Sequence, residues 1–140
     1  MIQGHAKIAE QPADKGAKSN LLVVDDDSQL TSLFATILEK AGYGVCLASN
    51  GLEALEAYRR AQAEQTPFDL VMMDLHMPVM DGRECLLHLR ELDRRVPVLL
   101  FTGSPYEELG ELYSLVKAVI PKPVRIAPLL EHIGLALGPR

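Results

Sequence analysis

The sequence predicts an α/β fold in which a doubly wound parallel sheet is covered by helices on both faces. Two observations predict it. From Leu21 onward, short apolar runs alternate with longer stretches of helical period, which is typical of βαβ units. The apolar runs have little polar interruption, as expected for strands that are covered on both faces. With 140 residues, the chain has the size of one globular domain.

Five strands and five helices are expected in alternation. The strand candidates are Leu21–Val24, Val45–Ala48, Leu70–Met73, Val96–Phe101 and Ala118–Ile120. Apolar residues at helical spacing follow the first strand and the last one, and both stripes are expected to pack into the core. Their members are Leu30, Leu33, Phe34, Ile37 and Leu38, and Ile126, Leu129, Leu130, Ile133 and Leu137.

Two helix starts are marked by a capping residue with an acid three positions later. Asn50 with Glu53 marks the second helix. Ser104 with Glu107, and with Pro105 at the first helical position, marks the fourth helix.

Residues 1–20 are polar and aperiodic, so we expect a flexible N-terminal tail or linker without a packed element, followed by one domain over residues 21–138.

Composition limits the classes of partner. The net charge of −5, the pI near 5.3 and the lack of any block of Lys or Arg give no indication of binding to nucleic acid or to an anionic membrane.

Cys46 and Cys85 lie in apolar segments without paired spacing, which favours buried reduced thiols over a disulfide or a metal site. No stretch approaches the roughly 18 apolar residues of a spanning helix, and no secretory leader is visible, so the expected location is cytoplasmic.

Polar side chains follow the predicted strands on one edge of the sheet, where doubly wound folds bind their ligands. These residues are Asp25, Asp26 and Asp27 after the first strand, Asp74 at the end of the third, Thr102 at the end of the fourth and Lys122 at the end of the fifth. Clustered carboxylates repel one another unless a cation is present, and Mg²⁺ is the simplest one. Asp27, next to Ser28, fits a helix cap better than a ligand.

The same residue types are suited to a site that accepts a phosphoryl group. A carboxylate beside a metal ion can attack such a group and form an aspartyl phosphate. Thr102 offers a hydroxyl donor and Lys122 a compact positive charge, and both suit the incoming negative charge. Each residue alone is weak support, and their combination carries the prediction.

The chain resembles the receiver domain of the response-regulator family of two-component signalling. The motifs LLVVDDD, VMMDLHMPVMDG, LLFTGS and IPKP occur in the family's order over about Leu21 to Leu137. The resemblance implies a flavodoxin-like (βα)5 fold with strand order 2-1-3-4-5. It also implies a phosphoprotein that works in signal transduction or a phosphorelay. Such a protein is not an enzyme in the usual sense but a signalling receiver with self-catalysed phosphorylation and dephosphorylation.

The resemblance implies a role for each site residue. Asp74 would accept the phosphoryl group from a phosphohistidine, and Thr102 and Lys122 would contact that group and move when it arrives. Asp25, Asp26, Asp74 and the backbone carbonyl of His76 would hold Mg²⁺ as the cofactor.

The residues around this site shape access and signalling in the family. Met77 and Pro78 would shape the loop beside Asp74, and Gly82 would close its turn. The His76 side chain would modulate dephosphorylation, and Gly103 would leave room for the phosphodonor.

The chain departs from the family at Val119, where an aromatic residue usually stands three positions before the lysine. Val119 has no ring to swing inward, so the signal needs another carrier. Tyr106 and the backbone near Thr102 are the candidates, although Tyr106 also fits an ordinary helix surface.

The expected partners are a histidine kinase or histidine phosphotransfer protein and a downstream target protein, without nucleic acid or membrane. The chain would be a single-domain regulator or relay, and the alternative is the receiver portion of a hybrid histidine kinase. A phosphatase of the haloacid-dehalogenase type would need a second Asp two positions after its nucleophile, where His76 stands. A flavodoxin-like electron carrier would need a phosphate-binding loop rich in Gly, Ser and Thr after the first strand, and no such loop follows Val24. Such a carrier would also show a flavin absorbance band.

Overall fold

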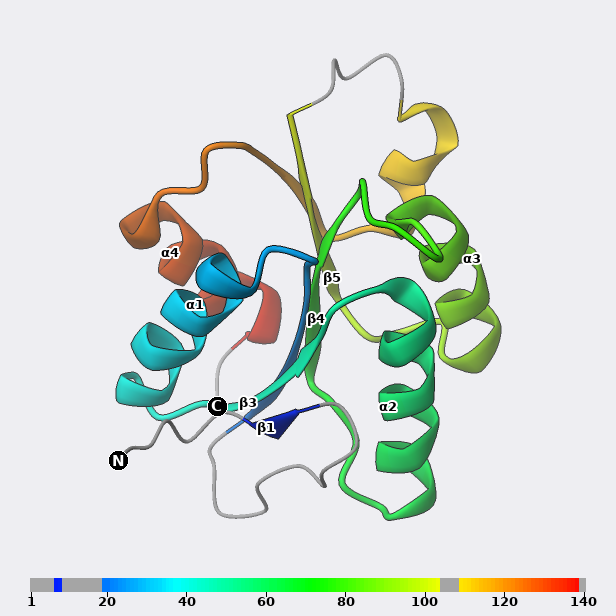
Figure 1. The fold of residues 1–140 in the computed structure, drawn as a ribbon, viewed down its shortest axis with the longest axis horizontal. Helices are drawn as coiled ribbons and strands as arrows, with labels where there is room; N and C mark the ends of the chain where they lie inside the picture. Colours follow the sequence, from blue (N-terminus) through cyan, green and yellow to red (C-terminus); the bar gives the residue numbers. More distant parts are fainter. Residues whose placement is uncertain (1–6, 9–18, 104–108, 139–140) are drawn as a thin grey trace.

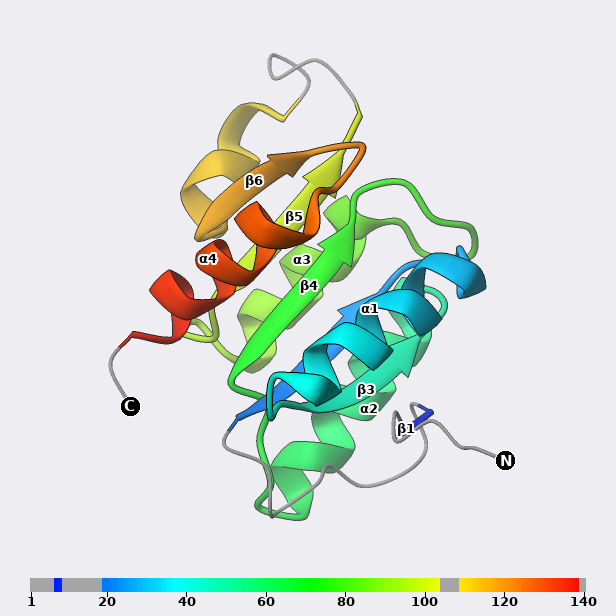
Figure 2. The same cartoon turned by 90° about the vertical axis from the view of Figure 1, so that its left-hand side faces the viewer.

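The computed structural model describes residues 7–8, 19–103 and 109–138, and its centre is a six-stranded sheet with the order β1-β3-β2-β4-β5-β6. All neighbouring strands pair in parallel. The strands are β1 (Lys7–Ile8), β2 (Asn20–Val24), β3 (Gly44–Ala48), β4 (Leu70–Asp74), β5 (Val98–Thr102) and β6 (Ala118–Pro121). Without the edge strand β1, this order is the expected 2-1-3-4-5, and Figure 2 shows the arrowheads of β4, β5 and β6 pointing the same way.

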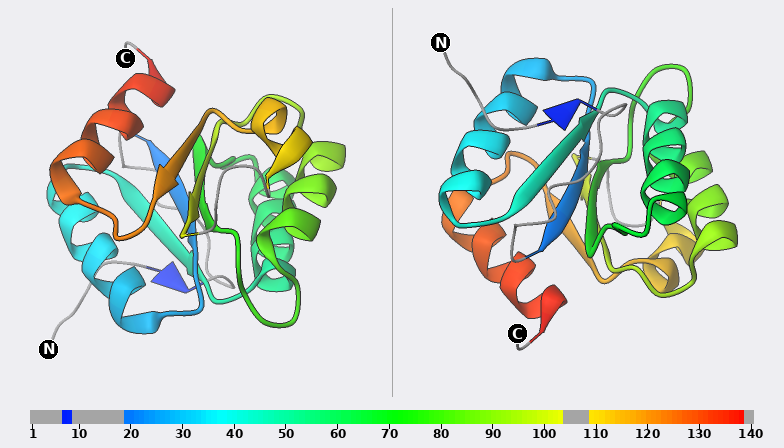
Figure 3. Two further views of the ribbon diagram at one scale, coloured as in Figure 1. Left: turned by 90° about the horizontal axis from the view of Figure 1, so that it is seen from above. Right: turned by 90° about the horizontal axis from the view of Figure 1, so that it is seen from below.

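Helices cover both faces of the sheet, as the fold class requires. They are α1 (Ser28–Lys40), α2 (Gly51–Ala63), α3 (Gly82–Leu92), α4 (Ile126–Leu137) and the 3-10 helix η2 (Gly110–Leu115). Figure 1 shows α1 and α4 on one side of the sheet and α2 and α3 on the other, and the views along the perpendicular direction show the same three layers (Figure 3).

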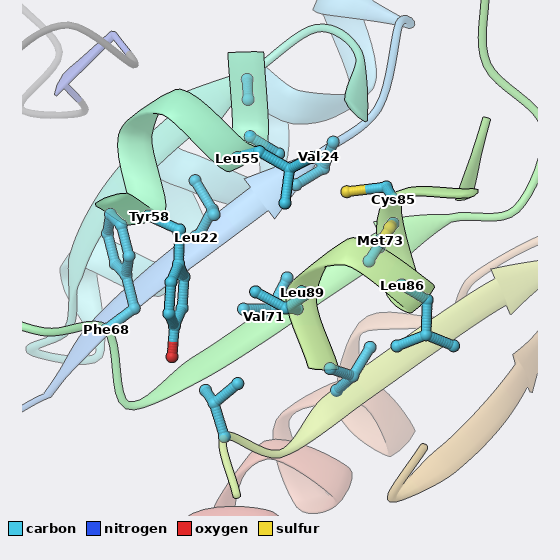
Figure 4. Close-up of a cluster of buried hydrophobic side chains, with 14 of the residues drawn as sticks. Leu22, Val24, Leu55, Tyr58, Phe68, Val71, Met73, Cys85, Leu86 and Leu89 are labelled. Atoms are coloured by element: carbon cyan, nitrogen blue, oxygen red, sulfur yellow. The ribbon is translucent and has the colours of Figure 1, made fainter. Parts of the chain in front are cut away.

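The core divides into two clusters because successive side chains of a strand point to opposite faces. Leu22 and Val24 pack with residues of α2 and α3, and Figure 4 shows this cluster around Tyr58. Leu21 and Val23 pack with residues of α1 and α4. Both faces of the strand are therefore buried, which explains the continuous apolar runs of the sequence.

Two predicted helix caps are confirmed. Asn50 caps α2, since its side chain accepts the Glu53 N–H at 2.9 Å. The Glu53 carboxylate accepts from the N–H and hydroxyl of Ser49, at 2.8 and 2.9 Å, one residue earlier than in the usual reciprocal box. Asp27 caps α1, and its carboxylate accepts the N–H groups of the second and third helical residues.

The structure differs from the sequence-based expectations at the N-terminal segment. Lys7–Ile8 pair with Cys46 and Leu47, although no packed element was expected within residues 1–20. The pairing covers backbone groups that β3 would otherwise leave open as an edge strand. Two residues are too few to show a periodic pattern, so the sequence could not reveal them.

The segment between β5 and β6 also differs. The described residues have the 3-10 helix Gly110–Leu115 there in place of the expected fourth α-helix. The predicted start at Ser104, Pro105 and Glu107 lies outside the described residues, as does Tyr106. β5 begins at Val98, two residues later than predicted, because Pro97 has no N–H for the ladder.

The structure is consistent with the expected state of the cysteines, since Cys46 and Cys85 are both buried and neither forms a disulfide. Among the described residues, no helix combines the length and the apolar character that crossing a membrane would need.

Candidate functional site

The predicted site residues meet at the carboxyl edge of the sheet. Asp25 directly follows β2, Asp74 ends β4, Thr102 ends β5 and Lys122 directly follows β6. The backbone ladder continues past the strand ends, since the N–H of Leu75 donates to Phe101 O at 2.9 Å and that of Lys122 to Thr102 O at 3.0 Å. The four side chains are thus anchored on paired backbone rather than on free loops.

Three carboxylates form the centre of the site. One oxygen each of Asp25, Asp26 and Asp74 lies within 4.8 Å of the others. Asp25 and Asp74 are buried, with 3% and 4% of their surface exposed, whereas Asp26 is exposed. This grouping confirms the predicted convergence. Asp27 is directed to the cap of α1 instead, as expected.

Burial makes Asp25 the unusual carboxylate of the three. Its Oδ1 accepts the Asp27 N–H at 2.9 Å, whereas its Oδ2 is buried without a hydrogen-bond partner in the structure. Burial, assisted by the charges of Asp74 and Asp26, raises the pKa of Asp25 to about 6, against the opposing effects of the Asp27 N–H and Lys122. Within the described residues, the site therefore holds one buried carboxylate oxygen that accepts no hydrogen bond.

Lys122 already contacts the predicted phosphoacceptor. Its Nζ lies 2.9 Å from Asp74 Oδ2 and 3.9 Å from Asp25 Oδ2. Partial burial lowers the pKa of Lys122, but the hydrogen bond and charge of Asp74 outweigh that effect and raise it above its ordinary value. The ammonium group stays charged and offsets part of the negative charge of the cluster.

The donor set fits a hard divalent cation. Within the described residues, three carboxylates and one ammonium group leave an excess of negative charge, and Asp25 Oδ2 is an oxygen ligand that accepts no hydrogen bond. Mg²⁺ takes such oxygens and keeps several waters. The carboxylates are therefore able to hold the ion that the sequence predicts.

The loop between β4 and α3 passes directly beside Asp74. The N–H of His76 points at Asp74 Oδ1 at 3.3 Å, and the His76 side chain is exposed. Further along, Val79 has a φ of +68°, and the N–H of Met80 donates to Pro78 O at 2.7 Å. A β-branched residue rarely adopts this conformation, so no sequence signal could have predicted it.

The loop ends in a close contact between α3 and the end of β4. The N–H of Gly82 donates to Leu75 O at 2.8 Å, and a Cβ added to Gly82 would lie 2.4 Å from Asp74 O. Glycine is required here, as expected for the residue that closes the turn. Asp81 caps α3 by accepting the Glu84 N–H at 2.9 Å. This cap was not predicted, although the spacing of Asp81 and Glu84 gives the same signal as that of Asn50 and Glu53.

Three further predicted residues flank the site. Thr102 is buried at the end of β5, the strand next to that of Asp74. Gly103 is exposed, and a Cβ there would meet no atom of the described residues within 4 Å. Val119 is half-buried and packs against the core cluster beneath α2 and α3.

The chain is similar to a defined set of known proteins. The family model described as "Response regulator receiver domain" matches residues 21–134. The chain is 36% identical over 121 residues to the transcriptional regulatory protein CpxR homolog of Haemophilus influenzae, and the match covers 85% of this chain and 50% of that protein. The chain thus spans about half the length of this curated relative.

Solved structures show the same fold. A CheY-like response regulator receiver domain protein from Methanospirillum hungatei matches with a TM-score of 0.74 and 32% identity, over 85% of this chain and 93% of that one. The receiver domain of sensor histidine kinase PA1611 from Pseudomonas aeruginosa matches with a TM-score of 0.74 and 26% identity, over 88% and 100%. Its structure has a magnesium ion coordinated in the active site cleft. These comparisons give no support to a phosphatase of the haloacid-dehalogenase type.

Proposed function

Because the chain belongs to the response regulator receiver domain family of two-component signalling, we propose that Asp74 is its phosphoacceptor. The observation that carries the proposal is the placement of Asp74. It is a buried carboxylate at the end of a central strand, within 4.8 Å of two further carboxylates and 2.9 Å from an ammonium group. A rigid strand end of this kind can hold a nucleophile in place while its neighbours neutralise the incoming charge.

Asp25, Asp26 and Asp74 are the side chains that would hold Mg²⁺, together with the backbone carbonyl of His76. The unpartnered Oδ2 of Asp25 supports this assignment. When bound, the ion supplies positive charge that orients and polarises the phosphoryl oxygens.

In the transfer step, an oxygen of Asp74 attacks the phosphorus of a phosphohistidine. The new P–O bond forms as the P–N bond breaks, and the imidazole of the donor leaves with the electron pair of that bond and takes up a proton from solvent. Lys122 then contacts a phosphoryl oxygen in place of the Asp74 carboxylate, and the Thr102 hydroxyl donates to another. Gly103, whose added Cβ would meet no atom of the described residues within 4 Å, supports the approach of the donor.

His76 stands two positions after Asp74 with an exposed side chain, which would control the access of water to the phosphorylated residue. We propose that the domain catalyses its own phosphorylation and dephosphorylation, with the partner supplying the phosphoryl group. The partners that this chemistry requires are a histidine kinase or histidine phosphotransfer protein and a downstream target protein. Val119 packs against the core without a ring, so the change at Thr102 reaches the target surface through the backbone of β5 and β6.

The test is the intact mass of the protein after incubation with acetyl phosphate, with and without Mg²⁺. Wild type should gain one phosphoryl group only with Mg²⁺, and Asp74→Asn should gain none. Asp27→Asn is the matched control, because it removes a neighbouring carboxylate and keeps an oxygen for the cap of α1. Labelling of Asp74→Asn, or labelling of wild type in EDTA at the same rate, would contradict the assignment.

A further inference from the structure

A charged hollow lies at the edge of the sheet opposite Asp74. Its volume is about 880 Å³, and it adjoins the amino-terminal ends of β5 and β6. Figure 2 shows these strand ends beside the last turns of α4. The charged residues of its lining are Arg90, Glu91, Arg94, Arg95 and Lys117. We refer to it as the basic hollow.

Positive charge dominates the basic hollow, although the chain as a whole has a net charge of −5. Arg94, Arg95 and Lys117 are accessible, and within the described residues no ion pair joins them to a carboxylate. Glu91 is the one acid of the lining, and its side chain, which is 80% exposed, lies 3.6 Å from His88 Nδ1 on the same helix. An anion would therefore meet at least three accessible cations here.

Arg90 adds a fixed positive charge to the lining of the hollow. Its Nε and Nη2 donate to Leu115 O at 3.0 and 2.7 Å, and its Nη1 donates to Asp93 O and Val96 O at 3.2 and 2.8 Å. Carbonyl oxygens satisfy the donors of the guanidinium group but do not cancel its charge.

Asp93, directly before Arg94, offsets part of the charge of Arg90, and its carboxylate oxygens accept hydrogen bonds from other donors. The Oδ2 of Asp93 accepts the Tyr58 hydroxyl at 2.6 Å, and its Oδ1 accepts the N–H groups of Arg95 and Val96 at 2.8 and 3.2 Å. Asp93 is not part of the lining. It therefore fixes the turn that presents Arg94 and Arg95 without occupying the hollow.

We propose that the basic hollow binds a small ligand with two or more phosphate groups, of the size of a nucleotide. Arginine side chains suit phosphate because their planar donors bind its oxygens in pairs. The volume lies in the range of small-molecule sites, and Val96, Pro97 and Leu115 offer apolar surface for the rest of the ligand. A long nucleic acid would meet repulsion from the remaining acidic surface.

The experiment is an NMR titration of the ¹⁵N-labelled chain in EDTA, with inorganic pyrophosphate and ATP as separate probes. Without Mg²⁺, the carboxylates of Asp25, Asp26 and Asp74 repel both probes, so the site at the other edge does not compete. Saturable shifts at the amides of Arg94, Arg95 and Lys117 are expected. Tighter binding of ATP would show that the apolar part of the hollow is used, and equal binding would show that the phosphates suffice. Both results support the site.

The double variant Arg95→Ser/Lys117→Ser should weaken both probes on the order of tenfold, because it removes two charged donors. Arg59→Ser is the control, since Arg59 is an exposed cation on α2 outside the hollow, and it should bind as wild type does. Shifts that do not saturate, or equal weakening in the control, would overturn the proposal. Binding of a polyglutamate peptide without binding of either phosphate probe would overturn it as well, because it would indicate a protein-docking surface.

Discussion

Replacement of Asp25 by asparagine should stabilise the metal-free protein while it removes a metal ligand. The hydrogen bond from the Asp27 N–H should survive, because Asp25→Asn keeps the Oδ1 that accepts it at 2.9 Å. What the substitution removes is a buried negative charge whose second oxygen has no hydrogen-bond partner and which lies beside two more carboxylates. The unfavourable charge therefore disappears and the favourable contact remains.

The pKa of Asp25 sets the size of the effect and its pH window. A rise from 3.8 to about 6 in the folded state corresponds to about 3 kcal/mol of destabilisation at pH 8, at about 1.4 kcal/mol per pH unit. Between these two values the folded chain holds a proton that the unfolded chain has lost, so the free energy of unfolding of wild type falls as the pH rises from about 4 to about 6. The advantage of Asp25→Asn should be small at pH 4.5 and largest at pH 8. Because the surroundings relax, we expect about 1–3 kcal/mol there.

Urea unfolding in EDTA at both pH values measures this difference, with Asp27→Asn as the control that should show no such advantage. Addition of Mg²⁺ should then stabilise wild type and have little effect on Asp25→Asn, since an ion that binds only the folded state shifts the unfolding equilibrium. An Asp25→Asn protein less stable than wild type in EDTA at pH 8 would refute the reasoning, because it would show that the carboxylate is stabilised by its contacts.

Three other substitutions test the fold around the site. Gly82→Ala should lower the free energy of unfolding by about 1–3 kcal/mol and slow phosphorylation by acetyl phosphate, because its Cβ would collide with Asp74 O and α3 would have to move. Wild-type values in urea unfolding and in labelling would contradict this. Gln65→Gly should raise the free energy of unfolding by about 0.5–1 kcal/mol, because Gln65 follows the cap of α2 with a φ of +62°, which glycine adopts without steric cost. Gln65→Ala is the control, and an equal gain in that variant would contradict the conformational explanation. Asp93→Asn should be less stable than wild type at pH 7. Burial raises the pKa of Asp93, but the hydrogen bonds from the Tyr58 hydroxyl and nearby N–H groups outweigh burial and hold that pKa below its ordinary value. The stability from Asp93 is present above the unfolded pKa of about 3.9 and is lost as the pH falls through the lower folded pKa, so a loss in urea that persists unchanged at acid pH would contradict it.

Local pattern was sufficient to predict much of the fold and the members of the site. The apolar runs and helical stripes predicted the five central strands and their order in the chain, because burial on both faces leaves a periodic trace in the sequence. The same holds for the caps at Asn50 and Asp27, where a side chain bonds backbone a few residues away. Asp25, Asp26, Asp74, Thr102 and Lys122 could be named as site residues since each stands at the end of a strand in a parallel sheet.

The remaining features depend on contacts between distant segments. The Lys122 ammonium group contacts Asp74 although 48 positions separate the two residues in the sequence. Asp25 is shielded from water only when β2, β3 and β4 are packed together. The edge strand Lys7–Ile8 and the basic hollow around Arg90 likewise join parts of the chain that no local pattern relates. The sequence by itself determined the five central strands and which polar residues reach the carboxyl edge, because hydrophobic periodicity is local. Only the tertiary structure decided the distances, burial and pKa values, because these depend on the charges and atoms that packing brings together.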